Sequence, residues 1–170
     1  DLHSFPTRRS SDLRTCATRR QFHDYLEAED VGVAVIKFKN GAIGTVEGTT
    51  NVYPRNLEET LYIFGESGTV KIGGTSTNNI DVWDFADETE DDAKNKGLKE
   101  QTSNVYGNGH TSLFADVIDA INNDRKPYVD AAAGRGALEV VLSIYKSQKT
   151  CEPVKLPLEG FASTDMKGEF

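Results

Sequence analysis

The stretch that most constrains the fold is a succession of four predicted strands between Val31 and Gly73. Its segments are rich in β-branched and aromatic side chains, which favour extended backbone. An Asn-Gly pair, Asn40 and Gly41, separates the first two segments, and this pair is a strong signal for a tight hairpin. The order of the segments predicts an antiparallel meander that other parts of the chain must cover. The predicted strands are Val31–Phe38, Ala42–Glu47, Leu57–Phe64 and Gly68–Ile72.

The first of these strands is apolar on both sides. Successive side chains of a strand point to opposite faces, and an antiparallel sheet with one face in water alternates apolar and polar residues. Here one face carries Val31, Val33 and Val35, and the other carries Ala34, Ile36 and Phe38. We therefore expect helices on one face and a second subunit or domain over part of the other. The alternative is a central strand of a small sheet that its own loops bury.

The rest of the chain supplies further strands and two helices. An edge strand is expected between Arg14 and Asp30, a fifth strand at Ile80–Phe85, and a terminal edge strand at Pro153–Pro157. Pro54 lacks the N–H that a ladder needs, so the chain must leave the sheet or bulge there. The charged stretch Asp84–Gln101 lacks the alternating carboxylates and glycine of a calcium loop, so we interpret it as a solvated loop.

Two segments near the end have helical periodicity. The first is capped by Thr111 and Ser112 and stops at the breaker cluster 122–127; the second runs from about Ala131 to Gln148. The apolar stripe of the first comprises Leu113, Phe114, Val117, Ile118 and Ile121, and the inner side of the second comprises Leu138, Val141, Leu142 and Tyr145. Together the segments predict an α+β fold, an open, mainly antiparallel sheet of five to six strands with two helices on one face.

Composition narrows the classes of protein and partner. The chain has 170 residues and a net charge of −8, which argues against nucleic acid and against an anionic membrane as partners. It has no apolar run long enough to span a bilayer and no signal-peptide core before the first strand. The two cysteines, Cys16 and Cys151, can in principle form a disulfide, but without a secretory signal a reduced pair and a cytoplasmic location are expected.

The first 13 residues look foreign to the rest. Ser4 to Leu13 has no helical or strand periodicity, and it resembles the one-frame translation of a common sequencing adapter. We expect residues 1–13 to be non-native and exclude them from the fold, as one excludes an expression scar. Native sequence then starts near Arg14, and residues 14–170 form one domain. The alternative is a genuine basic tail.

Motifs for complete catalytic chemistry are absent from the sequence. It contains no glycine-rich phosphate loop between a strand and a helix, no nucleophile elbow, no Cys-x-x-Cys and no His-Glu-x-x-His. With three histidines, one of them His3 in the foreign segment, a histidine-based metal site is not expected. We therefore predict no catalytic, cofactor-binding or metal-binding residues within this chain.

Two patches remain as candidates for ligand binding. Tyr106, Asn108 and His110 belong to a Tyr-Gly-Asn-Gly-His segment directly before the first predicted helix. Its glycines let backbone approach a ligand, and the helix N-terminus offers free N–H donors. Alternatively, the glycines only form a turn and His110 only starts the helix. Tyr53 and Arg55, beside Pro54, form a second candidate patch for an anionic or sugar-like ligand.

An ordered set of segments resembles the C-terminal domain of the Gfo/Idh/MocA (glucose–fructose oxidoreductase / inositol dehydrogenase) family. The resemblance covers about Arg14 to Pro157, in the family's order, and no single motif in it is diagnostic. The segments are Glu29–Gly48, Leu61–Val70, His110 followed by Phe114–Ile121, Gly136–Ser147, and Val154–Pro157.

The resemblance implies a longer parent enzyme. Family members have an N-terminal Rossmann domain that binds NAD(P) and a C-terminal domain that shapes a sugar or cyclitol pocket and assembles oligomers through its open sheet face. The catalytic lysine and an Asp/His pair precede the region that is matched here. We therefore expect the chain to bind no NAD or NADP itself and to be inactive alone, whereas the parent is expected to be an NAD(P)-dependent sugar, possibly sugar-nucleotide, or cyclitol dehydrogenase.

Only substrate-side residues can be carried over from the family. His110 matches a position, just before a helix, where family members place a sugar-contacting side chain, and Tyr53 and Arg55 lie on a loop that matches another substrate-facing segment. That loop departs in length from the family pattern. The alternative function is a stand-alone binding or dimerisation module that never had a catalytic half.

Overall fold

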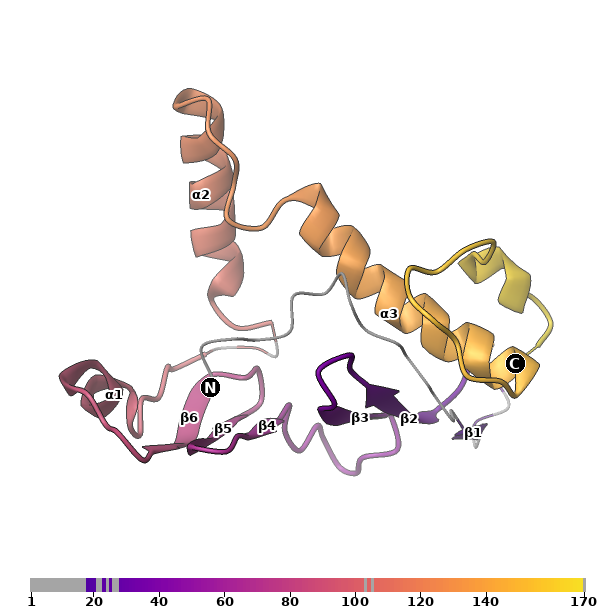
Figure 1. Cartoon of the computed structure of the whole chain (residues 1–170), viewed down its shortest axis with the longest axis horizontal. Helices are drawn as coiled ribbons and strands as arrows, with labels where there is room; N and C mark the ends of the chain where they lie inside the picture. The colour runs from indigo at the N-terminus through magenta and orange to yellow at the C-terminus, as the bar shows by residue number, and fades with distance from the viewer. Residues whose placement is uncertain are drawn as a thin grey trace. The chain divides into compact units, whose positions relative to one another are not determined.

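Figure 1 shows a computed structural model of the chain, which describes residues 18–20, 23, 25, 28–102, 104 and 106–169. The strands are β1 (Thr18–Arg20), β2 (Val31–Lys37), β3 (Ile43–Thr49), β4 (Leu61–Phe64), β5 (Gly68–Gly73) and β6 (Asn79–Phe85). The helices are α1 (Glu90–Asn95), α2 (Gly109–Asn122), α3 (Ala131–Thr150) and the 3-10 helix η2 (Ser163–Met166). The described residues form two compact units: a central unit, Val52–Val129, and a terminal unit made of those before Val52 and after Val129.

This content confirms the predicted α+β class, with antiparallel strands in open sheets and two main helices. The structure adds that the strands form two sheets of three, β1-β2-β3 and β4-β5-β6, where the sequence predicts one larger sheet. The separation falls in residues 50–60, which contain no strand. Pro54 lies in this segment without an N–H to donate, so the predicted departure of the chain from the sheet is confirmed.

The predicted hairpin of the terminal unit is confirmed in β2 and β3, which pair along their whole length. In the turn, the Asn40 side chain accepts a hydrogen bond from the N–H of Ala42 at 3.1 Å. Gly41 takes a φ of +91°, which glycine adopts without steric cost. On the other side of β2 lies β1, so the predicted edge strand is confirmed over Thr18–Arg20.

The two faces of this sheet differ in burial. Ala34 and Ile36 are 1% and 7% exposed, whereas Val33 and Val35, on the opposite face, are 36% and 39% exposed. The covered face meets α3, whose side chains line a pocket together with Ala34. Of the two helices expected on one face of the sheet, α3 lies over this face, and the second face presents apolar side chains to solvent.

The buried side of α3 differs from the predicted one. Val141 and Tyr145 do line the pocket beside the sheet, but Leu138 is 57% exposed. The residues of α3 that are fully buried are Ser143 and Ser147, at 0% and 2% exposure. Helical periodicity of apolar residues misses them, because a small polar side chain can be buried when its hydroxyl finds a backbone acceptor.

The C-terminal segment makes several contacts with α3. The Ser147 hydroxyl donates to the Glu152 carbonyl at 2.8 Å, and the Lys149 ammonium donates to the Asp165 carbonyl. Val154 and Met166 of this segment are 7% and 1% exposed, and η2 contacts α3. The C-terminal segment therefore contributes to the hydrophobic core of the terminal unit.

The terminal edge strand predicted at Pro153–Pro157 is not present, and that prediction was wrong. Both prolines lack an N–H, so the segment can offer few donors to a sheet edge. It attaches to α3 instead: the N–H of Leu158, directly after it, donates to the carboxylate of Glu139 at 2.6 Å.

The central unit is built on β4, β5 and β6. Val70 of β5 is 3% exposed and pairs with Trp83 of β6. The Trp83 indole donates to the carboxylate of Asp92 in α1 at 2.9 Å. The interpretation of residues 84–101 as a loop was therefore wrong over α1, where Thr89 and Asp92 form a reciprocal capping box.

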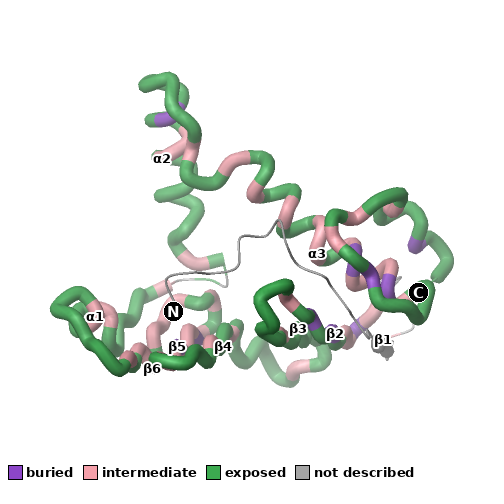
Figure 2. Tube along the Cα trace, viewed as in Figure 1, coloured by how far each residue is buried: buried purple, intermediate pink, exposed green. Residues whose placement is uncertain are grey.

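The second main helix, α2, begins earlier than predicted. It starts at Gly109 with Asn108 at the N-cap, three residues before the predicted cap at Thr111. Its stripe is largely exposed in Figure 2, and Phe114, Ile118 and Ile121 are 63%, 59% and 75% exposed. The sequence correctly predicts that these residues share a face, but in this structure that face is not buried.

Some expectations fall on residues outside the described ranges. These are the non-native origin of residues 1–13 and the state of Cys16, the possible partner of Cys151. Cys151 is exposed and has a free thiol.

Candidate functional site

The segment that leads into α2 contains three of the five predicted substrate-binding residues: Tyr106 and Asn108 precede the helix, and His110 lies in its first turn. All three are exposed, and Tyr106 is 75% exposed. Gly107 has a φ of +63°, and its N–H donates to the Asn104 carbonyl at 3.4 Å, so the chain turns here. This turn lies between Tyr106 and the start of α2 at Gly109.

Asn108 occupies the N-cap position but does not cap the helix with its side chain. An asparagine at this position ordinarily accepts a hydrogen bond from an N–H of the first turn. Here its amide nitrogen instead donates to the Glu100 carboxylate at 2.9 Å and to the Gln101 carbonyl at 3.1 Å. The first turn of α2 is therefore not capped by the Asn108 side chain. The Thr111 N–H donates to the Asn108 carbonyl at 3.2 Å, and the N–H groups before it are suited to bind a polar ligand group.

His110 lies within the first turn of α2, not directly before the helix as predicted. Its ring centroid is 6.5 Å from that of Phe114, one turn further along, with the ring planes tilted by 34°. A neutral imidazole has one donor and one acceptor nitrogen, so it can bind a hydroxyl group in either sense.

Tyr53 and Arg55 lie on the connection between β3 and β4. Both are exposed, Tyr53 to 96%. Among the described residues, no hydrogen bond, ion pair or ring contact joins them to Tyr106, Asn108 or His110. The predicted residues thus form two separate groups of the central unit, one at the start of α2 and one beside Pro54.

The terminal unit contains a pocket that the sequence did not predict. It has a volume of about 370 Å³ and lies between the β2–β3 hairpin and α3. Its polar lining includes Glu29, Asp30, Thr50 and Tyr145. The Tyr145 hydroxyl donates to the Glu29 carboxylate at 2.7 Å, and the second oxygen of that carboxylate is buried without a partner among the described residues.

Asp30, also in this pocket, is 1% exposed and joins two other segments. Its carboxylate lies 3.0 Å from Nδ1 of His23 and accepts the hydroxyl of Thr50 at 3.2 Å. His23 is partly buried, and its ring lies against the Asp30 carboxylate. These contacts join residues far apart in sequence, so local pattern alone could not reveal them; the one available signal was the acidic pair directly before a strand.

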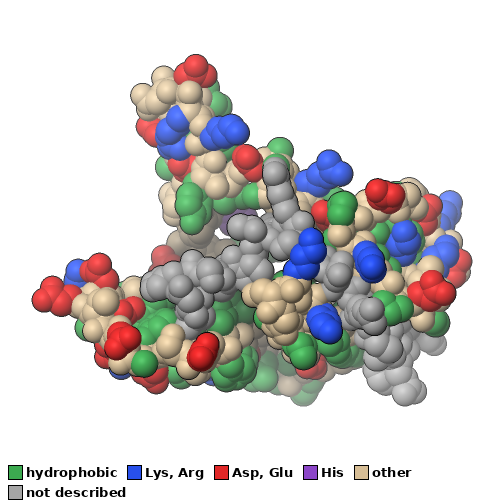
Figure 3. All heavy atoms as spheres, viewed as in Figure 1, with side chains coloured by type: hydrophobic (Ala, Val, Ile, Leu, Met, Phe, Trp, Pro, Cys, Tyr) green, Lys and Arg blue, Asp and Glu red, His purple; other side chains and the backbone are tan. Residues whose placement is uncertain are grey.

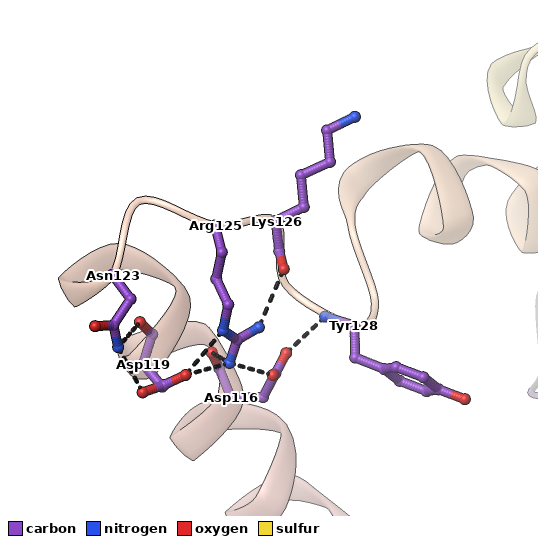
Figure 4. A network of polar contacts seen from close by, with 6 residues as sticks. All are labelled: Asp116, Asp119, Asn123, Arg125, Lys126 and Tyr128. Atoms are coloured by element: carbon purple, nitrogen blue, oxygen red, sulfur yellow. Dashed lines mark hydrogen bonds and ion pairs between the residues drawn. The ribbon is translucent and has the colours of Figure 1, made fainter.

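A polar network fixes the C-terminal end of α2 (Figure 4). Arg125 forms ion pairs with Asp116 at 2.7 Å and with Asp119 at 2.5 Å, and Asp116 also accepts the N–H of Tyr128 at 2.7 Å. The Tyr128 N–H, followed by the Arg125 guanidinium, holds the pKa of the Asp116 carboxyl below its ordinary value. The same two carboxylates, Asp119 first, raise the pKa of Arg125. This network orders the connection that follows α2.

Other kinds of site find little support in the described ranges. Acidic side chains gather around α1 (Figure 3), but no group of three or more His, Cys, Asp or Glu residues there or elsewhere in the described part of the chain has metal-site geometry. In the same residues, no helix is both long and apolar enough to cross a membrane.

Comparison with known families gives one match that covers most of the chain. Residues 5–156 match the family described as "Oxidoreductase family, C-terminal alpha/beta domain". No curated protein matches the sequence.

Two solved structures resemble the chain in both sequence and fold. One is the WlbA dehydrogenase from Bordetella pertussis in complex with NADH and UDP-GlcNAcA, at 33% identity and a TM-score of 0.73, over 86% of this chain and 40% of that one. The other is the WlbA dehydrogenase from Chromobacterium violaceum, also with NADH and UDP-GlcNAcA, at 29% identity and a TM-score of 0.74, over 87% and 41%.

A third structure shares the fold alone. Levoglucosan dehydrogenase, in complex with NADH and levoglucosan, aligns at 20% identity and a TM-score of 0.63 over 86% of this chain and 45% of that one. The chain thus spans 40–45% of the length of these three proteins.

Proposed function

The chain belongs to the Gfo/Idh/MocA oxidoreductase family through its C-terminal α/β domain, and we propose that it is the substrate-binding and oligomerisation domain of an NAD(P)-dependent sugar or cyclitol dehydrogenase. The observation that carries this proposal is the 33% identity with a WlbA dehydrogenase that is bound to NADH and UDP-GlcNAcA. Within the proposed class, a sugar nucleotide is the favoured substrate, because both WlbA structures contain one.

Tyr106, Asn108 and His110 are the proposed contacts to the sugar. Their exposure and their position at the uncapped first turn of α2 support this role. Sugar hydroxyls both donate and accept hydrogen bonds. The His110 imidazole can serve in either sense, and the Asn108 amide oxygen can accept, because the amide nitrogen already donates to Glu100 and Gln101. The exposed Tyr106 ring offers an apolar surface beside these polar groups.

Tyr53 and Arg55 are proposed to contact an anionic part of the same substrate class. A guanidinium binds a phosphate or carboxylate through two parallel hydrogen bonds, a geometry that lysine cannot offer. UDP-GlcNAcA, the compound in the WlbA structures, is itself a nucleotide sugar acid. The exposure of both side chains supports this assignment.

The cofactor is proposed to bind to a part of the enzyme other than the residues described here. NAD(P)-binding folds use a parallel sheet in which a glycine-rich turn links a strand to a helix N-terminus. The described sheets are antiparallel, and no strand in them leads through such a turn into a helix. The described residues therefore do not fit NAD(P), and hydride transfer between the nicotinamide and the sugar is assigned to the complete enzyme.

The exposed face of the β1-β2-β3 sheet is the proposed oligomer contact. Val33, Val35 and Ile43 are 36%, 39% and 72% exposed, and strand pairing places all three on one face. An apolar patch on a sheet is typical of a surface that a second subunit covers.

The complete reading frame that contains Arg14–Phe170 provides the test. The protein expressed from it should reduce NAD+ or NADP+ in the presence of UDP-GlcNAcA or a related sugar. The His110→Ala variant should have a raised KM or a lowered kcat for the sugar and an unchanged cofactor affinity. Lys126→Ala is the matched control, because its exposed side chain lies beyond the other end of α2 (Figure 4).

Two results would contradict the proposal. A reading frame without a strand–glycine loop–helix segment upstream would favour a stand-alone binding or dimerisation module. Equal sugar kinetics of the parent and His110→Ala would remove His110 from the substrate site.

A further inference from the structure

A turn of the central unit is connected by a series of side-chain hydrogen bonds to the segment that precedes α2 and ends at Asn108, which we call the α2 loop. The turn, residues 74–78, joins β5 to β6 and ends at Asn78. The amide oxygen of Asn78 accepts from the N–H and from the hydroxyl of Ser76, both at 3.2 Å. Its amide nitrogen donates to the carbonyl of Glu100 at 2.6 Å. One side chain thus closes the turn with its oxygen and holds a distant segment with its nitrogen.

Glu100 carries the connection on to α2. Its N–H donates to the Asn78 carbonyl at 2.9 Å, so the two residues are joined through both backbone and side chain. Its carboxylate accepts from the amide of Asn108 at 2.9 Å. A parallel link runs from the Ser76 hydroxyl to the Thr102 hydroxyl at 3.2 Å. The N-cap residue of α2 is therefore tied, through Glu100, to the turn of the sheet.

The α2 loop also approaches this turn closely. A Cβ atom added at Gly107 would lie 3.4 Å from the Ser76 hydroxyl oxygen and 3.5 Å from the Ser76 Cβ. Gly107 additionally has a φ of +63°, where other residues are strained. The loop thus lies against the turn at the point where it leads into α2.

We propose that Asn78 and Glu100 are positioning residues that hold Tyr106, Asn108 and His110 in place for the ligand. The proposal rests on the function proposed for that loop. Tyr106, Asn108 and His110 are exposed, so they lack the core packing that orders buried side chains. We attribute the ordering of this loop to the hydrogen bonds that connect it to the turn at residues 74–78. Neither positioning residue is assigned a contact with the substrate.

The two roles of Asn78 can be separated by substitution. Asn78→Asp keeps the oxygen that accepts from Ser76 and loses the nitrogen that donates to Glu100. Glu100→Gln keeps an oxygen that can accept from Asn108, whereas Glu100→Ala removes it. Asn40→Ala is the control, because Asn40 also accepts a local hydrogen bond in a hairpin turn but lies in the terminal unit.

Amide hydrogen exchange of the 170-residue chain gives the first readout. Loss of one such hydrogen bond is expected to speed exchange in residues 106–112 roughly tenfold in Asn78→Asp and Glu100→Ala. In Glu100→Gln and Asn40→Ala, the amides of this segment should exchange at the rate of the unsubstituted chain. Unchanged exchange in Asn78→Asp and Glu100→Ala would overturn the proposal.

Titration with UDP-GlcNAcA gives the second readout and separates the two proposals. Asn78→Asp and Glu100→Ala should weaken its binding roughly three- to tenfold, the effect expected of one lost hydrogen bond, and Glu100→Gln should restore it. If the parent binds and all variants bind equally, the positioning proposal fails while the proposed function stands. If the parent does not bind UDP-GlcNAcA, the proposed function fails, and the positioning proposal falls with it.

Discussion

The two main helices have similar sequence patterns but very different surroundings. In α3, two residues are almost fully buried, and the helix meets the β2–β3 hairpin on one side and the C-terminal segment on another. In α2, only Ala120 is buried, although the apolar stripe is regular. Figure 2 shows this contrast along the two helices. Periodicity thus reports that a helix has an apolar face, and it does not report what covers that face.

The same contrast separates the kinds of interaction that hold the two helices. Buried groups hold α3, including the Met166 side chain and the Tyr145–Glu29 hydrogen bond. At α2, exposed polar groups make the contacts at both ends: Asn108 forms a hydrogen bond with Glu100 at the start, and Arg125 forms an ion pair with Asp116 at the end. Burial of apolar surface contributes more stability than exposed ion pairs do, so the helices should respond differently to substitution.

The largest expected effect is on the core beside α3. Met166→Ala should lower the free energy of unfolding by roughly 2–5 kcal/mol, because it leaves a cavity where a side chain is 1% exposed. Ile121→Ala in α2, where the side chain is 75% exposed, should change it by about 0.5 kcal/mol or less. Urea denaturation of both variants measures the difference. Equal losses of unfolding free energy in the two variants would contradict the difference in burial between the two helices.

A smaller effect is expected from the hydrogen bond between α3 and the start of β2. Tyr145→Phe removes the hydroxyl that donates to the Glu29 carboxylate at 2.7 Å, while the other oxygen of that carboxylate has no partner among the described residues. The buried carboxylate is then left without this donor, at a cost of roughly 1–3 kcal/mol. Tyr128→Phe, in an exposed residue after α2, is the control. A denaturation midpoint equal to that of the parent would show that this bond adds nothing.

The smallest effect is expected at the far end of α2, and it depends on pH. The folded state lowers the pKa of Asp116, first through the Tyr128 N–H and then through Arg125. A lowered folded pKa adds stability above the unfolded pKa, and this contribution is lost as the pH falls through the folded value. Below about pH 4, the thermal midpoint of the parent should therefore fall more steeply than that of Asp116→Asn. Parallel pH profiles would indicate that the network does not act on stability.

Sequence was sufficient for the local elements of the fold. The Asn40-Gly41 hairpin, the strands on either side and the two helices follow from turn chemistry and periodicity, which act over a few residues. The family resemblance, confirmed by the match over residues 5–156, adds the domain type.

Contacts between residues far apart in the sequence could not be predicted from turn chemistry and periodicity. The separation into two sheets depends on which strands pair after Pro54, and α1 depends on the bond between Trp83 and Asp92. The buried Ser147 of α3 donates to the carbonyl of Glu152, directly before the segment that was predicted to be a strand. For the candidate site, the sequence named the exposed loop residues, but it could not reveal that Asn78 and Glu100 hold them.

The most direct test of the central claim is a chemical-shift titration of the isotope-labelled 170-residue chain with UDP-GlcNAcA. We expect the shifted backbone amides to cluster at residues 106–111, with a second group at Tyr53 and Arg55, and we expect NADH to shift neither group. Shifts confined to the pocket between Glu29 and Tyr145, or no shifts with the sugar nucleotide, would contradict the account.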